Sequence, residues 1–201
     1  MTRIVLATHN RGKVAELRRI LDGFDVVGLD EFPGAPDVPE TELTFEGNAL
    51  LKARAVAAFT GLPAVADDSG LCVDALNGMP GVLSARWSGG LGAATGDRDA
   101  ANLQLVLDQL GDVPDGQRGA SFVCSAVLVV PDGVEHCVEG RLHGSLIRDP
   151  RGTGGFGYDP IFVPEGETRT TAEMSPEEKD AISHRGKAFR ALAALIPEAV
   201  A

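Results

Sequence analysis

The sequence predicts a mixed α/β domain in which helices flank a central sheet. Short apolar segments, which indicate buried strands, alternate with segments whose apolar residues recur every three or four positions, as in amphipathic helices. After residue 120 the pattern changes to two β-rich segments, 121–130 and 134–142, separated by a turn, which predicts a long hairpin. No linker divides the 201 residues, so we expect one domain (residues 1–201), in which the hairpin could form a second lobe.

The first half of the chain begins with an apolar strand and a polar loop that opens a helix. Gly23 is the expected C-terminal cap of this helix, and Thr44 is the expected N-cap of the next one. Residues 32–42 combine three prolines with several acids and indicate a mobile loop. The expected elements are, in order, a strand at 4–7, a helix up to Gly23, a strand at 24–29, a helix at 45–59 and a strand at 64–66.

Helices in the second half are predicted mainly from residues that cap helix N-termini. Thr95 or Asp97 begins a helix with a stripe of leucines on one face. Ser175 starts a capping-box sequence, and a final helix is expected from about Ser183. These helices complete the alternation of elements that an α/β domain requires.

The charge of the chain restricts its partners. There are 29 acidic and 18 basic residues, so the formal net charge is −11. Such a surface repels phosphate backbones, which excludes a DNA or RNA polymer as the expected partner. A small nucleotide remains possible, because it needs only a local cluster of positive groups and a divalent cation.

Cysteine usage and hydropathy point to the cytoplasm. The three cysteines have no CxxC spacing, which argues against a zinc site or a disulfide framework and for a reducing compartment. The apolar part of the N-terminus is too short for a signal peptide, and no stretch approaches the length of a membrane span. We therefore expect no membrane association.

Two adjacent carboxylates, Asp67 and Asp68, follow the predicted strand 64–66. A strand that ends in paired acids presents oxygen ligands at the edge of a sheet, where α/β proteins place metal and phosphate chemistry. The alternative is that the acids form a polar turn with Ser69 and Gly70, since these are common turn residues. The choice depends on the other polar segments of the chain.

The first of these segments is the loop between the first strand and the first helix. A loop that opens a helix offers free backbone N–H groups and the positive end of the helix dipole, which suit a phosphate. The alternative is an ordinary N-cap with a solvated lysine. The loop consists of Thr8, His9, Asn10, Arg11, Gly12 and Lys13.

The second segment surrounds the start of the helix at 45–59. Asn48 and Lys52 are four residues apart and share one helix face, for which a solvated surface is the default interpretation. Glu40 and Glu42, just upstream, could supply a further metal ligand. A mobile acidic loop is the alternative there.

The third and fourth segments suit a purine base. Residues 151–162 hold Phe156 and Tyr158 among four glycines, which permit close approach of the backbone, and Asp159 can accept from a ring N–H. Near the start of the last helix, donors gather that suit a 6-oxo group better than a 6-amino group. The alternatives are a glycine-rich surface loop and a capped helix with exposed basic residues. The donors are Lys179, Ser183, His184, Arg185 and Lys187.

Catalysis by a side-chain nucleophile is not indicated. The chain lacks a Ser/His/Asp order and an activated cysteine. Two acids with separate lysines fit metal-assisted attack of water on phosphorus better than acyl transfer.

Together these segments resemble the inosine/xanthosine triphosphate pyrophosphatases, enzymes that remove deaminated purine nucleotides. The resemblance spans nearly the whole chain, and its landmarks in this order are specific to the family. The landmarks are residues 8–13 (THNRGK), 44–49 (TFEGNA), 66–71 (ADDSGL), 154–160 (GGFGYDP) and 183–186 (SHRG).

The resemblance implies a homodimer of two-lobed α/β subunits, with the active site in the cleft between the lobes. It implies Mg²⁺-dependent hydrolysis of dITP, ITP and XTP to the monophosphate and pyrophosphate. Asp68 would be the proton acceptor and, with Glu40, a metal ligand. The other residues that the resemblance assigns to the substrate are Thr8, His9, Asn10, Arg11, Gly12, Lys13 and Lys52 for the triphosphate, and Ser69, Phe156, Gly157, Tyr158, Asp159, Lys179, His184 and Arg185 for the nucleotide.

The mechanism expected from this resemblance separates the two acids. Asp68 would help to deprotonate the water that attacks the α-phosphorus, and Asp67 would orient the site. Donors from His184 and Arg185 would reject ATP, because its 6-amino group would leave them unpaired. GTP has the same 6-oxo group, so its rejection requires that the site also disfavour the 2-amino group.

Two positions and two other functions stay open. His9 stands where relatives often carry a smaller residue, which affects the contacts of the loop, and Glu42 is a rival of Glu40 as metal ligand. The chain could also be a pyrophosphatase for modified pyrimidine or methylated nucleotides, or a non-catalytic nucleotide sensor. The donors at 183–185 argue against the first, and the retained acids argue against the second.

Overall fold

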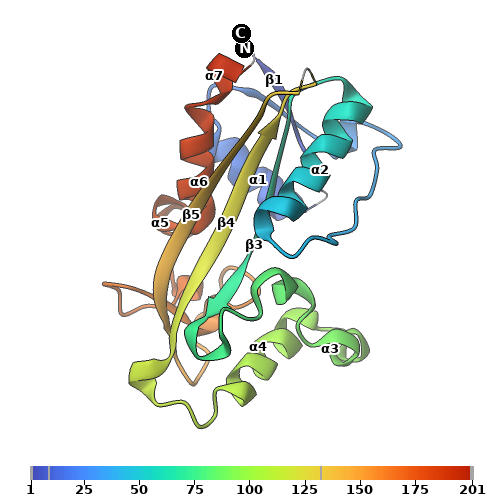
Figure 1. Ribbon diagram of the computed structural model, residues 1–201. Coiled ribbons are helices and arrows are strands. Elements are labelled where there is room, and N and C mark those ends of the chain that lie inside the picture. The colour runs from blue at the N-terminus through green and yellow to red at the C-terminus, as the bar shows by residue number, and fades with distance from the viewer. Residues whose placement is uncertain (1, 9, 132, 200–201) are drawn as a thin grey trace. The chain divides into compact units, whose positions relative to one another are not determined.

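A mixed six-stranded sheet forms the centre of the fold (Figure 1). The structure is a computed structural model, and it describes residues 2–8, 10–131 and 133–199. The strand order is β2-β1-β3-β4-β5-β6; β1 is parallel to β2 and β3, and β5 is antiparallel to β6. The predicted α/β class with a mixed sheet is confirmed. The strands are β1 (Arg3–Leu6), β2 (Asp25–Gly28), β3 (Ala64–Val73), β4 (Gly119–Val129), β5 (Glu135–Leu146) and β6 (Phe162–Pro164).

The helices with a predicted cap begin directly after it, whereas α3 and α7 were not predicted. Thr44 Oγ1 accepts from Gly47 N–H at 3.0 Å, and Asp97, rather than Thr95, caps its helix through Ala100 N–H. The helices are α1 (Arg11–Ile20), α2 (Phe45–Thr60), α3 (Gly89–Thr95), α4 (Arg98–Gln109), α5 (Pro176–Ile182), α6 (His184–Ala193) and α7 (Ile196–Ala199). None of the helices in the described part of the chain is long and apolar enough to cross a membrane.

The chain divides into two compact units. Unit 1 contains Met1–Asp68, Cys124–Gly140 and Ser183–Ala201, and unit 2 contains Ser69–Val123 and Arg141–Ile182. Their cores are distinct sets of buried residues. The prediction of a single two-lobed domain with a cleft therefore stays a prediction, and each unit is described by itself.

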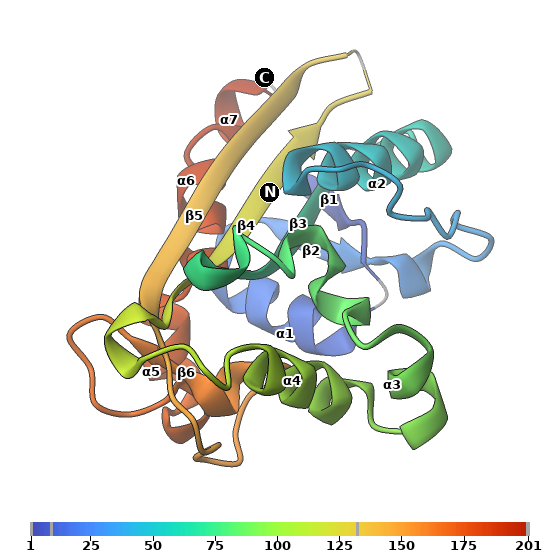
Figure 2. The ribbon, with the colours of Figure 1, turned by 60° about the horizontal axis from the view of Figure 1, so that its bottom comes forward.

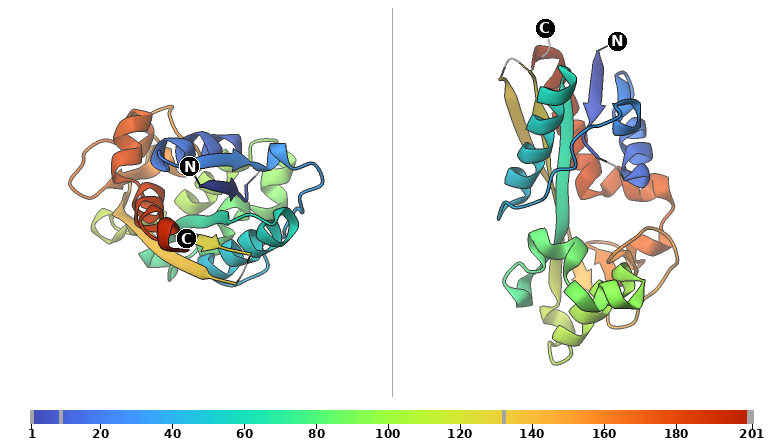
Figure 3. Two further views of the ribbon diagram at one scale, coloured as in Figure 1. Left: turned by 90° about the horizontal axis from the view of Figure 1, so that it is seen from above. Right: turned by 90° about the vertical axis from the view of Figure 1, so that its right-hand side faces the viewer.

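In unit 1, helices cover both faces of the sheet (Figure 3). Successive residues of a strand point to opposite faces. Ile4 and Leu6 of β1 accordingly pack with α1 and α6, whereas Val5 packs with α2. This alternation explains why the apolar run at 4–7 is continuous, since a strand that is buried on both faces has no polar side.

In unit 2, one cluster joins α4 to the far ends of the long strands (Figure 2). Leu103 and Val106 of α4, with Leu110 directly after the helix, pack with Leu71 and Val73 of β3. The rings of Phe122 and Phe162, whose centroids are 4.5 Å apart, complete this core.

The prediction that β3 ends before the acidic pair is wrong. The strand does not stop at residue 66 but continues to Val73, so Ser69 and Gly70 belong to a strand and not to a turn. The physical reason is that Leu71 and Val73 are fully buried in the core of unit 2, and they extend the strand past its polar residues.

The order of the parallel strands creates a favoured position for a ligand. From β1 the chain passes to β2 on one side and then to β3 on the other, and ligands of α/β proteins bind at such a switch point. β1 stops at Leu6, which pairs with Val65, whereas β3 runs on. Asp67 and Asp68 therefore follow the point at which β3 loses its neighbour β1.

Candidate active site

Asp67 is a buried anion that two cations share. Its Oδ2 accepts from Lys13 Nζ at 2.9 Å and from Arg185 Nε at 3.3 Å. The side chains of Asp67 and Arg185 are only 1% and 4% exposed. Lys13 lies in the first turn of α1 and Arg185 in the first turn of α6, so one carboxylate joins β3 to both helices.

These cations keep Asp67 ionised. Burial by itself would raise the pKa of Asp67, but the charges of Lys13, Arg185 and Lys52 outweigh it and hold the pKa well below its usual value. Asp67 therefore stays charged and bound to Lys13 and Arg185. Such a carboxylate is suited to positioning other groups and not to exchanging protons.

Asp68 has a different environment, although it is also buried. Its Oδ2 accepts from Asn48 Nδ2 at 2.9 Å. Burial and the nearby charge of Glu40 raise the pKa of Asp68, against the opposing effects of Lys52, the Asn48 hydrogen bond and Lys13. The adjacent acids thus have pKa values that are shifted in opposite directions, which is typical of sites where one group transfers protons and the other does not.

Asn48 and Lys52 are not on a solvated helix face, so the default interpretation of this pair is wrong. Asn48 is fully buried, and its Oδ1 accepts from Glu42 N–H at 2.9 Å. Lys52 Nζ donates to Glu40 Oε1 at 2.8 Å and to the carbonyl oxygen of Asp67 at 2.7 Å. The sequence showed the spacing of this pair, but its burial depends on β3, which is distant in sequence.

Glu40 fits a metal ligand better than Glu42. The Glu40 carboxylate shares Lys52 with the Asp67 carbonyl group and is close enough to Asp68 to affect its pKa. Glu42 contacts Asn48 through its backbone N–H. Mg²⁺ is commonly held by one or two carboxylates with water and phosphate oxygens, so the donor set of Glu40 and Asp68 suits it. Within the described ranges, no group of three or more His, Cys, Asp or Glu side chains could hold a metal.

The start of α1 is organised by its own side chains. Asn10 Oδ1 accepts from Lys13 N–H at 3.1 Å, and Thr8 Oγ1 accepts from Asn10 N–H at 3.2 Å. These bonds hold the loop at the helix N-terminus, next to the Lys13 side chain that reaches Asp67. His9 lies outside the described residues, and Arg11 and Gly12 are described only as the first two residues of α1.

A second group of predicted residues is assembled in unit 2 around Asp159. This carboxylate is buried and accepts from Phe156 N–H at 2.8 Å, from Thr171 Oγ1 at 2.8 Å and from Lys179 Nζ. Lys179 Nζ also lies 4.9 Å from the centre of the Phe156 ring. Asp159 thus fixes the shape of the loop through its protein partners. Its contact with a base N–H stays a prediction.

The two aromatic rings of this loop have different environments. Phe156 is 53% exposed, whereas Tyr158 is buried and its OH donates to the Ser84 carbonyl oxygen at 2.8 Å. Stacking on a base is therefore open to the Phe156 ring, and the Tyr158 ring serves the core of unit 2. Gly157 N–H donates to Asp99 Oδ2 at 3.0 Å, a contact for which the sequence gave no signal.

The remaining predicted residues lie at the start of α6 and on β3. Ser183 caps α6 by accepting from Gly186 N–H at 2.8 Å, which places His184 and Arg185 in its first turn. His184 is buried, so it is not the exposed basic residue of the alternative interpretation. Ser69 is half-buried on β3, directly after Asp68.

Comparison with known proteins identifies the family. The model of the Ham1 family matches residues 4–195. The chain belongs to the Ham1 family. Among curated members, it is 61% identical to the dITP/XTP pyrophosphatase of Streptomyces coelicolor over 98% of each chain. It is 55% identical to that of Mycobacterium tuberculosis, over 98% of this chain and 95% of the other.

Solved structures of Ham1 relatives agree with the fold. A nucleoside-triphosphatase / dITP/XTP pyrophosphatase from Mycobacterium abscessus is 57% identical and superposes with a TM-score of 0.77, covering 98% of this chain and 100% of that one. A HAM1 protein from Coxiella burnetii is 44% identical, with a TM-score of 0.88 and coverage of 99% and 100%.

The burial of the Asp67 cluster predicts a large contribution to stability. Asp67→Asn should lower the free energy of unfolding by roughly 3 kcal/mol or more, because two cations would lose their shared carboxylate. Urea unfolding measures this change. The matched control is Glu135→Gln, which breaks the exposed pair with Arg54 (2.7 Å) and should cost less than about 1 kcal/mol. Equal stability of the two variants would contradict this account of Asp67.

Proposed function

We propose that the protein hydrolyses the deaminated purine nucleoside triphosphates dITP, ITP and XTP to the monophosphate and pyrophosphate. The names of relatives with 55–61% identity over nearly the whole chain support this substrate class. The observation that carries the proposal is the cluster in unit 1, where Lys13, Lys52 and Arg185 surround a pair of carboxylates. Removal of these triphosphates would keep them out of DNA and RNA.

The cluster is suited to a triphosphate and its metal. The N-terminus of α1 with Lys13, and Lys52 of α2, would bind the phosphates through charge and backbone N–H groups. Glu40 and Asp68 would hold Mg²⁺, which when bound would neutralise phosphate charge and polarise the phosphorus–oxygen bonds. Asp67 would fix Lys13 and Arg185 throughout the reaction.

Asp68 would act as the proton acceptor for the attacking water. Burial raises the pKa of its carboxylate in the protein without metal, and a carboxylate placed beside the attacking water can take its proton. Asn48 would hold one of its oxygens in place. Water activated in this way would attack the α-phosphorus, and Lys13 and Lys52 would stabilise the pyrophosphate that leaves.

The base would be recognised by the residues that the family resemblance assigns to it. The exposed ring of Phe156, in the loop that Asp159 fixes, offers a stacking surface, and Lys179 beside it is a donor. His184 and Arg185 would donate to the 6-oxo group. The 6-amino group of ATP cannot accept these bonds, so ATP would leave buried donors unpaired.

Assembly and location are also part of the proposal. The family resemblance supports a homodimer. The acidic surface, with a net charge of −11, supports a small nucleotide in place of a nucleic-acid polymer. The three cysteines, none of them in a disulfide, suit the cytoplasm, where the nucleotide pool lies.

The substrate class is tested by a single assay of pyrophosphate release. With Mg²⁺, dITP and XTP should be hydrolysed with a kcat/KM at least roughly a hundredfold above that of dATP, a ratio that unpaired buried donors can produce. Turnover of dGTP, which keeps the 6-oxo group, reports separately on discrimination at the 2-amino group. EDTA should abolish release, and added Mg²⁺ should restore it. Equal turnover of dATP and dITP would contradict the proposed specificity, and full activity in EDTA would contradict the proposed metal.

The role of Asp68 is tested by Asp68→Asn. The amide keeps an oxygen that can accept from Asn48, so the fold should persist, but it cannot take a proton. We expect kcat for dITP to fall at least roughly a hundredfold, the usual contribution of a general base. Asp112→Asn, at an exposed acid, is the control and should keep the wild-type kcat. Wild-type turnover in Asp68→Asn would exclude Asp68 as the base.

A further inference from the structure

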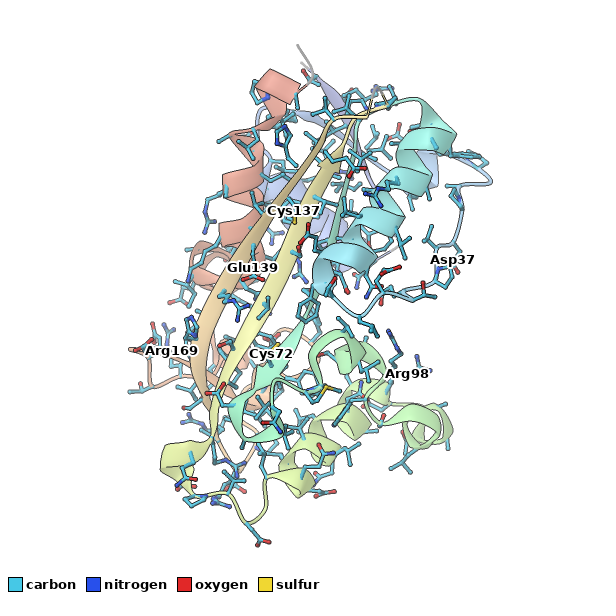
Figure 4. The ribbon with its side chains drawn as sticks, viewed as in Figure 1. Asp37, Cys72, Arg98, Cys137, Glu139 and Arg169 are labelled. Carbon is cyan, nitrogen blue, oxygen red and sulfur yellow. The ribbon has the colours of Figure 1, made fainter. Side chains whose placement is uncertain are left out.

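We infer that Asp99 is a positioning residue for purine binding, because it anchors the loop that carries Phe156. This inference rests on the proposed function and assigns a role to a residue outside the family landmarks. Asp99 is an exposed residue in the first turn of α4, directly after Arg98, which is labelled in Figure 4. It does not touch the reacting groups.

The contact is specific in geometry. Asp99 Oδ2 accepts from Gly157 N–H at 3.0 Å, across 58 residues of sequence. The neighbouring N–H groups of the loop have other partners: Phe156 N–H donates to Asp159 Oδ2, and Gly154 N–H donates to the Ala172 carbonyl oxygen. Asp99 therefore ties the backbone of this loop to α4. The two neighbouring N–H bonds instead join the loop to its own Asp159 and to residue 172.

The loop needs such a tie because of its glycines. Gly155 and Gly157 flank Phe156 and have φ values of +72° and +60°, a region that favours glycine. Because glycine has wide backbone freedom, these two residues do not by themselves hold the Phe156 ring in one orientation. Asp159 fixes the peptide on the N-terminal side of Phe156, and Asp99 fixes the peptide on its C-terminal side. The exposed ring is therefore held between two anchored peptide groups.

The consequence is preorganisation of the stacking surface. A ring that is already oriented loses less conformational freedom when a base stacks on it, so binding is tighter without any new contact to the ligand. Loss of the tie should weaken binding of the nucleotide and leave the chemical step at Asp68 unchanged. The expected signature is thus an increase in KM with little change in kcat.

The test compares Asp99→Ala with two matched variants. Asp99→Ala removes the acceptor at an exposed helical position where alanine is favourable, so the variant should fold. It should raise KM for dITP roughly tenfold, the value of one hydrogen bond to a charged group, and keep kcat within about twofold. Asp99→Asn retains an acceptor oxygen and should restore KM to within about threefold of wild type.

A second control separates the tie from the stability of the helix. Asp97 caps the same helix by accepting from Ala100 N–H at 3.0 Å and has no described contact with the loop. Asp97→Ala should lower the melting temperature but leave KM unchanged. An equal rise of KM in Asp97→Ala and Asp99→Ala would show a general loss of structure and overturn the inference.

Binding and amide exchange make the outcomes distinguishable. In EDTA, IMP should bind to Asp99→Ala roughly tenfold more weakly than to wild type, and hydrogen exchange of the Gly157 amide should accelerate in the same variant. If wild type neither hydrolyses dITP nor binds IMP, the proposed function fails and the inference fails with it. If wild type does both and Asp99→Ala has the wild-type KM and IMP affinity, the inference alone fails.

Discussion

The Asp67 carboxylate, buried in β3 and shared by Lys13 and Arg185, is the interaction on which the rest of unit 1 depends. A charge that is removed from water must be paired, and its partners here come from positions 54 and 118 residues away in the sequence. The Asp67 carbonyl oxygen accepts from Lys52 as well. One residue thus connects β3 with α1, α2 and α6, and it gathers positive charge where β3 extends beyond β1.

This arrangement also explains why two adjacent aspartates can differ in their partners and in the direction of their pKa shifts. Neighbouring side chains of a strand point to opposite faces, so Asp67 faces the cations and Asp68 faces Asn48. The cations hold the pKa of Asp67 low, whereas burial and the charge of Glu40 raise the pKa of Asp68. In unit 2, Asp159 performs the comparable structural task, since it is buried and receives both Lys179 and the backbone of Phe156.

Sequence predicted the features that depend on nearby residues and missed those that depend on distant ones. The caps at Thr44 and Ser183 were predictable, because a side chain there bonds to a backbone group three residues on. The length of β3 and the burial of Asn48 were not, because they result from packing against segments far away in the chain. The family landmarks predicted that Arg185 contacts the base. The sequence did not predict the bond between Arg185 and Asp67.

The central claim is that Asp67 and Arg185 stabilise each other as a buried pair, and a double-mutant cycle tests it most directly. The free energy of unfolding is measured for wild type, Asp67→Asn, Arg185→Met and the double variant. The account predicts that the double variant loses less stability than the sum of the single variants, by about 1–3 kcal/mol. Additive losses, within about 0.5 kcal/mol, would contradict it.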